Sequence, residues 1–228
     1  MTKFSVAIDG PAGAGKSTIA KAAAQALGFV YVDTGAIYRT VGLAAKYRGF
    51  SPECPAQVVP MLPELEIDMK YVDGVQRMFL DGEDVSEKIR TSEASEYSSK
   101  VAAIPEVRTY LLEMQRNMAR KYDVLMDGRD IGTVVLPDAQ LKIFLTASAE
   151  ERARRRHLEY LKKGTEKTFE SVLEEVLNRD KRDSEREAAP LKQAKDAVLL
   201  DTGNLTLEES IQAVVELVND RRKAGTNP

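Results

Sequence analysis

The stretch of sequence that most constrains the fold is a glycine-rich loop close to the N-terminus. Residues 10–17 read GPAGAGKS and match the pattern G-x-x-x-x-G-K-[ST] at every fixed position. The loop follows a short apolar run at residues 4–8 and precedes an alanine-rich helical pattern at residues 17–27. A phosphate-binding loop needs that order of strand, loop and helix. The chain is therefore expected to bind a nucleotide phosphate group on an α/β fold.

The residues of this loop have separate expected tasks. Glycine lets successive backbone N–H groups approach phosphate oxygens, and the following helix contributes its N-terminal dipole. Lys16 is expected to reach the β- and γ-phosphates, and the Ser17 hydroxyl to join the shell of a Mg²⁺ ion. The residues expected to bind ATP are Gly10, Pro11, Ala12, Gly13, Ala14, Gly15, Lys16, Ser17 and Thr18.

Short apolar runs alternate with helical patterns along the chain. Continuous apolar runs of this length are typical of parallel strands that are covered on both faces. Ser148-x-x-Glu151 and Thr206-x-x-Glu209 have the form of capping boxes, which begin helices. The pattern predicts a five-stranded parallel sheet with helices on both faces. The candidate strands are residues 4–8, 29–32, 124–126, 141–145 and 197–200.

Two segments interrupt this alternation. Residues 65–80 alternate in part and turn at Asp73-Gly74, a dipeptide preferred in tight hairpins. Residues 150–187 are densely charged with a net charge of zero, and a solvated helical surface is the simplest interpretation of most charges there. Helical spacing nevertheless gathers two sets of these side chains, each on one helix face: Arg152, Arg155 and Arg156, and Arg179, Asp183 and Arg186.

These interruptions suggest a division of the chain into three parts. The hairpin indicates an inserted subdomain, and the charged segment, with a loop at residues 162–165, indicates a mobile helical hairpin, which we call the lid. The predicted division is a core of residues 1–35, 101–149 and 188–228, an insertion of residues 36–100 and a lid of residues 150–187.

Composition and missing motifs exclude several functional classes. One His and one Cys rule out a disulfide framework and metal sites built from several thiolates or imidazoles. The 33 Lys and Arg against 36 Asp and Glu argue against a nucleic-acid partner, and no D-x-x-G occurs, which excludes a switch GTPase. With no secretion signal and no long apolar stretch, we expect a cytoplasmic protein without a membrane partner.

Charged residues follow two of the predicted strands. Asp127 ends the run at 124–126, where a carboxylate can hold Mg²⁺ through water, and Arg129 stands two residues later. Arg39 follows the second strand. Ligands bind at the carboxyl ends of parallel strands, so both arginines are candidate site residues, and a surface ion pair is the alternative for each.

The scarcity of histidine also favours a particular acceptor. An enzyme that phosphorylates a hydroxyl needs a base, whereas a phosphate acceptor arrives ionised because its second pKa is ~6. Aligning and neutralising two phosphates is a task for Lys, Arg and Mg²⁺. The composition therefore favours a nucleoside monophosphate kinase over a sugar or protein kinase.

Several blocks resemble the signature sequences of bacterial cytidylate kinases. They are IDGPAGAGKST, VDTGAIYR, DGRDIGTVVLPDA, KIFLTAS-EER and NRDKRDSERE-APL, and they occur in the same order over essentially the whole chain. The resemblance implies a P-loop nucleoside monophosphate kinase fold with a monophosphate-binding insertion and an arginine-rich lid. It also implies a monomer that transfers the γ-phosphate of ATP to CMP or dCMP, with Mg²⁺ as cofactor.

The same resemblance implies roles for individual residues. Lys16, Arg129 and Arg155 would be catalytic, and Arg155 would face the donor nucleotide, with Arg152 and Arg156 as further candidates. Thr34, Arg39 and Arg129 would hold the monophosphate and its sugar, and Arg179, Asp183 and Arg186 would hold them from the lid side. Ser99, Arg108 and Asp130 would read the base. A carboxylate such as Asp130 also suits cytosine chemically, because it accepts from the N4 amine.

Two other functions fit the same motifs. A kinase for another small acceptor shares the phosphate loop, and an assay of ADP release with several acceptors separates it. A nucleic-acid-dependent ATPase or nucleotide-binding regulator would need a net basic surface, which the charge balance does not favour.

Overall fold

The computed structural model describes residues 3–162 and 164–226, and the chain forms two compact units. We call Met1–Tyr31 with Tyr122–Pro228 the core unit and Val32–Lys121 the inserted unit. The inserted unit contains the whole of residues 36–100 and extends beyond them at both ends. The division into core, insertion and a separate lid stays a prediction.

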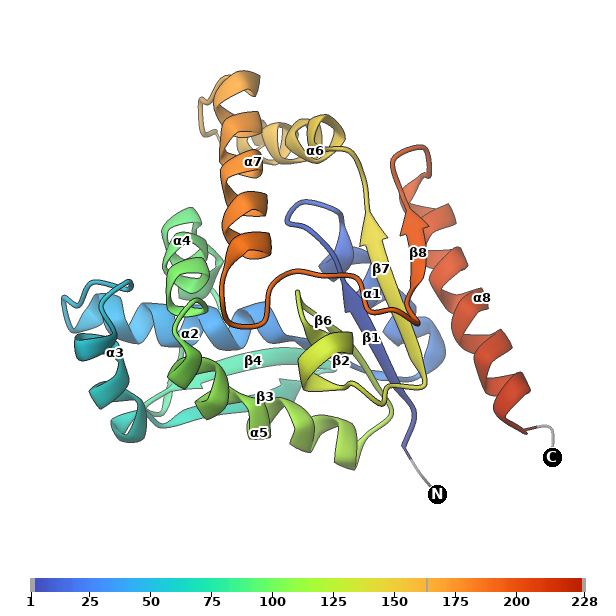
Figure 1. Ribbon diagram of the computed structural model, residues 1–228, viewed down its shortest axis with the longest axis horizontal. Helices are drawn as coiled ribbons and strands as arrows, with labels where there is room; N and C mark the ends of the chain where they lie inside the picture. Colours follow the sequence, from blue (N-terminus) through green and yellow to red (C-terminus); the bar gives the residue numbers. More distant parts are fainter. Residues whose placement is uncertain (1–2, 163, 227–228) are drawn as a thin grey trace. The chain divides into compact units, whose positions relative to one another are not determined.

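A five-stranded sheet runs through the core unit in the order β2-β6-β1-β7-β8 (Figure 1). The strands are β1 (Ser5–Asp9), β2 (Val30–Asp33), β6 (Val124–Asp127), β7 (Leu141–Thr146) and β8 (Val198–Asp201). Strand β1 is parallel to both of its neighbours, and β8 is parallel to β7. Every residue of β1 is buried, so this strand is covered on both faces. Each strand expected from the apolar runs is confirmed to within one residue.

Helices α1 (Lys16–Leu27) and α8 (Leu207–Thr226) pack against each other beside this sheet. Their apolar faces share one hydrophobic cluster with strands β1 and β7. Thr206 and Glu209 form the expected capping box at the start of α8, since each side chain accepts a hydrogen bond from the other residue's backbone N–H.

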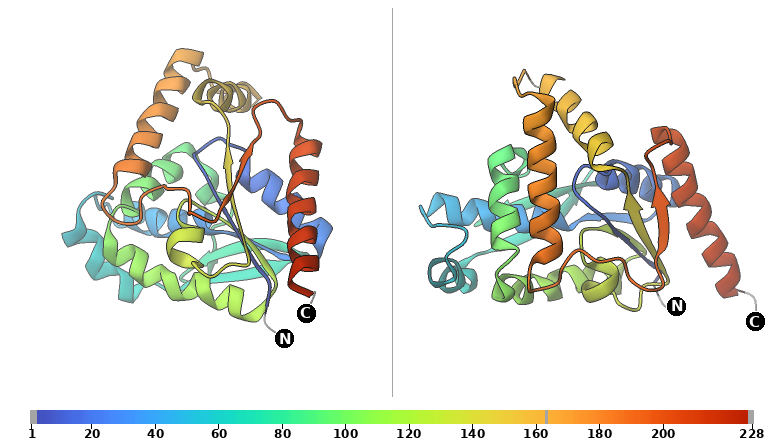
Figure 2. Two further views of the ribbon diagram at one scale, coloured as in Figure 1. Left: turned by 45° about the vertical axis from the view of Figure 1, so that its right-hand side comes forward. Right: turned by 45° about the horizontal axis from the view of Figure 1, so that its top comes forward.

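Helices α6 (Ala149–Lys162) and α7 (Phe169–Glu185) lie side by side in the core unit (Figures 1 and 2). They share a small cluster of Ala153, Val172 and Val176. The Ser148 hydroxyl accepts a hydrogen bond from the backbone N–H of Glu151, which is one of the two bonds of the predicted capping box, while the Glu151 carboxylate accepts from Arg154 and Arg155. The helical pair expected from the charged segment is therefore confirmed, although Lys163 of its loop lies outside the described residues.

The inserted unit combines a small antiparallel sheet with four α-helices. Strands β3 (Ile67–Val72) and β4 (Val75–Leu80) form the expected hairpin, and β5 (Glu83–Asp84) pairs with β4. Asp73 and Gly74 have φ angles of 51° and 73°, the pair of positive values that a tight primed turn needs. The α-helices are α2 (Thr34–Tyr47), α3 (Pro55–Met61), α4 (Ser92–Val101) and α5 (Pro105–Lys121), and the short turns are η1 (Leu62–Glu64) and η2 (Lys88–Arg90).

Helices α2 and α4 approach each other closely within the inserted unit. A Cβ atom at Gly42 would lie 3.0 Å from the Cβ atom of Tyr97, so a larger residue would push the two helices apart. A second hydrophobic cluster fills this unit, with Ile37, Val58 and Leu111 among its buried residues.

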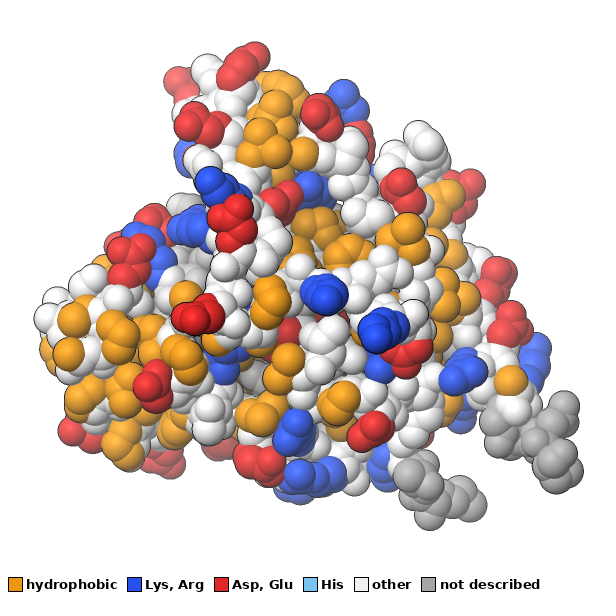
Figure 3. Space-filling view, viewed as in Figure 1, with side chains coloured by type: hydrophobic (Ala, Val, Ile, Leu, Met, Phe, Trp, Pro, Cys, Tyr) orange, Lys and Arg blue, Asp and Glu red, His pale blue; other side chains and the backbone are white. Residues whose placement is uncertain are grey.

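The surface carries mixed charge. On the face shown in Figure 3, Lys and Arg side chains are interspersed with Asp and Glu rather than separated from them. Within the described part of the chain, no helix has both the length and the apolar character needed to cross a membrane.

Candidate active site

The glycine-rich loop between β1 and α1 packs tightly against its neighbours. Gly10 has a φ of 149°, and a Cβ atom there would lie 1.9 Å from the carbonyl oxygen of Leu145 on β7. Gly13 has a φ of 78°, and its Cβ would lie 3.2 Å from the Cβ atom of Arg152 on α6. Both positions need glycine, because a side chain would either clash or strain the backbone.

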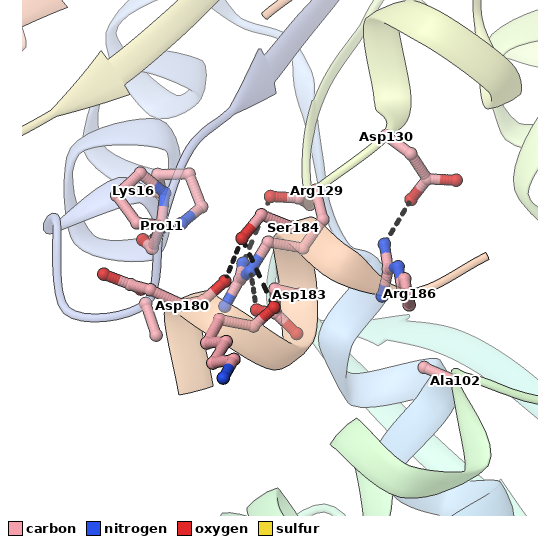
Figure 4. A network of polar contacts seen from close by, with 12 residues as sticks. Pro11, Lys16, Ala102, Arg129, Asp130, Asp180, Asp183, Ser184 and Arg186 are labelled. Atoms are coloured by element: carbon pink, nitrogen blue, oxygen red, sulfur yellow. Dashed lines mark hydrogen bonds and ion pairs between the residues drawn. The ribbon is translucent and has the colours of Figure 1, made fainter. Parts of the chain in front are cut away.

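Lys16 is the first residue of α1 and its side chain is buried within the loop. The ammonium group donates a 2.7 Å hydrogen bond to the carbonyl oxygen of Pro11 (Figure 4). Burial lowers the pKa of Lys16, and the guanidinium of Arg129 lowers it further. A phosphate group in the loop would reverse this destabilisation of the charged form, because it would supply the negative charge that the loop lacks.

Ser17 and Asp127 form an oxygen-rich pair at the carboxyl end of β6. The Ser17 hydroxyl donates to Oδ2 of Asp127 at 2.8 Å, and the hydroxyl of Tyr31 donates to Oδ1 at 2.9 Å. Hydroxyl and carboxylate oxygens are the ligands that Mg²⁺ prefers. Among the described residues, no three His, Cys, Asp or Glu side chains gather as a metal cage. The pair fits a metal ion that arrives with phosphate oxygens of its own, because Mg²⁺ is usually bound by one or two protein groups together with substrate phosphates.

Arg129 and Asp183 connect the end of β6 to helix α7. The Nε atom of Arg129 donates to Oδ2 of Asp183 at 2.9 Å (Figure 4). One Nη atom of Arg129 donates to the carbonyl oxygen of Gly128 at 3.1 Å. Burial raises the pKa of Asp183, but the guanidinium groups of Arg129, Arg179 and Arg186 outweigh it and hold this pKa below its ordinary value. Asp183 is therefore ionised at neutral pH.

Arg186 lies beyond the helix on which its spacing predicts it. Helix α7 ends at Glu185, so the prediction of a shared helix face is wrong for Arg186. Arg186 adopts an extended backbone conformation. Beyond it, Ala189 has a φ of 49° and the backbone N–H of Leu191 donates to the carbonyl oxygen of Asp183. Arg186 nonetheless lies 3.8 Å from the buried carboxylate of Asp130.

Three predicted site residues of the inserted unit lie on or next to helix α2: Thr34, Arg39 and Arg108. Asp33 caps α2 by accepting a hydrogen bond from Ala36 N–H, and its other oxygen forms a 2.8 Å ion pair with Arg39. Thr34 is the first residue of the helix and is buried. The guanidinium of Arg108, on α5, lies over the ring of Tyr38 at 5.4 Å.

Arg108 and Ser99 place buried polar atoms within the inserted unit. Arg108 is buried and donates to the carbonyl oxygen of Ala102 at 3.0 Å. The hydroxyl of Ser99, on α4, is also buried, and no group in the described residues forms a hydrogen bond with it. A buried hydroxyl without a partner is costly, which is consistent with a ligand completing its hydrogen bonding.

The sequence as a whole matches the family model described as cytidylate kinase over residues 6–220. This chain belongs to the cytidylate kinase family. A cytidylate kinase from Caldicellulosiruptor bescii is 52% identical to it over 217 residues, which cover 95% of this chain and 96% of that relative. A cytidylate kinase from Caldanaerobacter subterraneus subsp. tengcongensis is 52% identical over 218 residues, or 96% of each chain.

Membership of the cytidylate kinase family makes the chain an enzyme, a nucleotide-binding phosphotransferase. Its fold is confirmed as the P-loop kinase type, with a parallel five-stranded core and an antiparallel hairpin in the inserted unit. A shikimate kinase structure from Bacteroides thetaiotaomicron aligns with a TM-score of 0.46 and 14% identity, covering 95% of this chain and 98% of that one. This likeness is too low to bear on the reaction.

Asp9 of this cytidylate kinase family member supports the backbone that follows Asp130. Its two carboxylate oxygens accept hydrogen bonds from the N–H groups of Ile131 and Gly132 at 2.8 and 2.7 Å, where the one-turn helix η3 (Ile131–Val135) begins. Burial raises the pKa of Asp9 to about 6, although these hydrogen bonds partly oppose the shift. The sequence predicts no role for Asp9 or Tyr31, although Asp9 lies within the block IDGPAGAGKST. Asp9 is the last residue of β1, and Tyr31 lies within β2.

The arginines of helix α6 all contact protein groups in this cytidylate kinase family member. Arg155 donates to the carbonyl oxygen of Thr202 at 2.7 Å, and Arg156 donates to the hydroxyl of Tyr160 at 3.0 Å. Arg152 is buried, and its partners are the phosphate loop and helix α7. The core unit thus brings the loop together with Asp127, Arg129, Asp130, Arg152 and Asp183, while Thr34, Arg39, Ser99 and Arg108 belong to the inserted unit.

Proposed function

We propose that this kinase transfers the γ-phosphate of ATP to CMP or dCMP and releases ADP with CDP or dCDP. The observation that carries the proposal is the family match, which spans residues 6–220 and includes relatives named cytidylate kinase at 52% identity. The side chains that surround the phosphate loop supply the chemistry that such a transfer needs.

The donor end of the proposed reaction uses residues 10–18. ATP phosphates would accept hydrogen bonds from the loop N–H groups and from the N-terminus of α1. Lys16 would exchange its 2.7 Å contact with the Pro11 carbonyl for phosphate oxygens. Because phosphate carries more negative charge than a carbonyl, the exchange favours the ammonium form that burial now disfavours.

The Ser17 and Asp127 pair would hold Mg²⁺, Ser17 through its hydroxyl and Asp127 through a water molecule. When bound, Mg²⁺ supplies positive charge against the β- and γ-phosphates. Tyr31 would keep the Asp127 carboxylate oriented, because the Tyr31 hydroxyl donates to Oδ1 of Asp127 while the Ser17 hydroxyl donates to Oδ2.

The acceptor end of the proposed reaction depends on partner exchange. Arg129 is held by Asp183 in this structure, and a bound monophosphate would offer Arg129 a doubly charged partner instead. Asp183 would then accept from a ribose hydroxyl. Thr34, Arg39, Arg179 and Arg186 would complete the contacts with the acceptor's phosphate and sugar.

Base recognition is assigned to Asp130, Arg108 and Ser99. The Asp130 carboxylate accepts hydrogen bonds only, so it suits the N4 amine of cytosine and repels the O4 oxygen of uracil. Arg108 would donate to ring N3 and O2. The buried Ser99 hydroxyl would gain a hydrogen bond that it lacks among the described residues.

No protein base is required in this mechanism. The acceptor phosphate has a second pKa of ~6 and is largely ionised at neutral pH. The protein would align the two phosphates for an in-line transfer and neutralise the charge that spreads over the transferred group. Arg155 would join Lys16 and Arg129 in this task by leaving its contact with Thr202.

An ADP-release assay with CMP, dCMP, UMP, AMP and shikimate as acceptors tests the proposal. We expect turnover with CMP and dCMP well above turnover with the other three. Turnover with another acceptor alone would overturn the proposed substrate, and ATP hydrolysis without any acceptor preference would overturn the reaction class. The monomeric state, which light scattering can measure, and the cytoplasmic location are parts of the same proposal.

A further inference from the structure

Arg152 forms several hydrogen bonds beside the phosphate loop. Its guanidinium donates to the carbonyl oxygens of Ala147 and Ala12 at 2.9 and 3.0 Å. It also forms two parallel hydrogen bonds with the carboxylate of Asp180, at 3.0 and 2.6 Å. The Arg152 side chain is only 6% exposed. These contacts lie within the core unit and join the phosphate loop to both helices α6 and α7.

The contact with Ala12 has a consequence for the loop's donors. The peptide bond between Ala12 and Gly13 is planar and trans, so its C=O and N–H groups point in opposite directions. Because Arg152 holds the Ala12 carbonyl on its own side, the Gly13 N–H is directed to the opposite side of the loop. A cation on the carbonyl also polarises the peptide and makes its N–H a stronger donor.

Gly13 itself shows how closely the helix approaches. Its missing side chain leaves room for the backbone and Cβ of Arg152, and a Cβ atom at residue 13 would lie 3.2 Å from the Cβ of Arg152. The close packing places the guanidinium where it can reach the neighbouring carbonyl. Arg152 therefore restrains the loop by packing and by hydrogen bonding at the same residues.

Asp180 extends the restraint from the phosphate loop to helix α7. It lies on α7 next to Arg179 and three residues before Asp183, whose carboxylate holds Arg129. A bidentate pair allows little rotation of either partner. The position of this part of α7 is thus tied to the position of the loop by the Arg152–Asp180 pair.

We propose that Arg152 is a positioning residue, held by Asp180, that fixes the Ala12–Gly13 peptide so that the Gly13 N–H is presented to the phosphates of a bound nucleoside triphosphate. Arg152 acts through the loop and does not touch the nucleotide. The inference rests on the proposed function only in that ATP occupies the loop; it holds for any acceptor.

The variants Asp180→Asn and Arg152→Lys test this role. Asp180→Asn keeps Arg152 and removes a negative charge, so a direct contact of Arg152 with ATP would leave ATP binding equal or tighter. If Arg152 instead positions the loop, loss of its ion pair with Asp180 would weaken ATP binding. We expect about tenfold weaker binding of Mg-ATP, the equivalent of one charge-assisted hydrogen bond. Arg152→Lys keeps the charge but cannot bond Ala12 and both Asp180 oxygens together, so we expect a similar loss.

Asp196→Asn provides the matched control, because it removes the carboxylate partner of Lys142 on β7, another ion pair with one buried member in the core unit. ATP affinity, the amide shift of Gly13 and the thermal midpoint would be measured for all variants without any acceptor. We expect a change in ATP affinity and in the Gly13 shift for the Asp180 and Arg152 variants only.

Each outcome decides the proposal. Unchanged or tighter ATP binding in Asp180→Asn overturns it, and so does a fall in thermal midpoint with an unchanged Gly13 shift. If Arg152→Lys does not fold, Asp180→Asn carries the test alone, since Asp180 is partly exposed. If the wild-type protein fails to phosphorylate CMP and Asp180→Asn nevertheless binds ATP more weakly than the wild type, the proposed function is refuted while the role of Arg152 is supported.

Discussion

Arg129 and Asp183 form a 2.9 Å ion pair across 54 residues of sequence, and the Asp183 side chain is only 6% exposed. The pair joins the end of β6 to helix α7. A buried charge that loses its partner is costly, so the two side chains can separate only when something of opposite charge replaces the partner. A monophosphate and its sugar would replace both partners at once, which links acceptor binding to the local arrangement of α7.

Arg129→Ala is expected to abolish most turnover with CMP while ATP binding survives. The guanidinium would neutralise charge on the transferred phosphate, and removal of one such donor costs about a hundredfold or more in kcat. The measurement is kcat with CMP together with the dissociation constant for ATP. Arg154→Ala, which removes an exposed arginine from α6, is the control and is expected to retain normal kinetics. Normal phosphorylation of CMP by Arg129→Ala would show that its assigned role is wrong.

Asp130→Asn is expected to weaken the discrimination between CMP and UMP. An amide can donate to the O4 oxygen of uracil as well as accept from the amine of cytosine, so the ratio of kcat/KM values should fall about tenfold. Asp138→Asn removes an exposed carboxylate from the nearby loop and should leave this ratio unchanged. An unchanged ratio in Asp130→Asn would remove Asp130 from base recognition.

Asp9 should make the stability of the protein depend on pH. Burial raises its pKa from 3.8 to about 6, so the folded protein retains a proton that the unfolded chain loses in this range. The free energy of unfolding should therefore fall as the pH rises through this window, by up to about 3 kcal/mol from this group, and then level off. Asp183 has the opposite effect: because its pKa is lowered in the folded protein, its contribution to the free energy of unfolding is lost as the pH falls below the ordinary pKa of an aspartate.

Urea unfolding of the wild type and of Asp9→Asn at several pH values isolates this contribution. The difference between the two proteins should decrease from about pH 4 to about pH 6 and stay constant above about pH 7. The amide signal of Gly132, whose N–H is bonded to Asp9, should titrate in the same range. Parallel pH profiles and a constant Gly132 signal would contradict the shifted pKa.

Tyr31→Phe is expected to raise the concentration of Mg²⁺ needed for half-maximal binding of ATP. It removes only the hydroxyl that orients Asp127, and loss of such a supporting hydrogen bond typically costs about tenfold in metal affinity. ATP binding in the absence of Mg²⁺ should not change. Tyr122→Phe alters an exposed tyrosine of the core unit and serves as the control. Equal Mg²⁺ dependence in Tyr31→Phe and the wild type would rule out this role for Tyr31.

Local rules made much of the fold predictable. The five strands, the capping box at Thr206, the hydroxyl cap at Ser148 and the turn at Asp73-Gly74 depend on residues close in sequence, and the structure confirms each of them. The phosphate loop was equally predictable from the sequence, because its pattern of glycine, lysine and hydroxyl residues is contiguous. The spacing predicted Arg186 on the same helix as Asp183, but α7 ends at Glu185 and Arg186 is extended.

The order of elements, the phosphate loop and the residue types available for chemistry can all be predicted from residues that are close in sequence. The pairing of buried charges cannot: Arg129 binds Asp183, Arg152 binds Asp180 and the loop, and Asp9 binds the backbone after Asp130. The two kinds of interaction differ in their separation along the chain. Helix caps, turns and apolar runs are set by neighbours within a few residues, whereas the partner of a buried charge is selected among groups that folding brings together from distant segments.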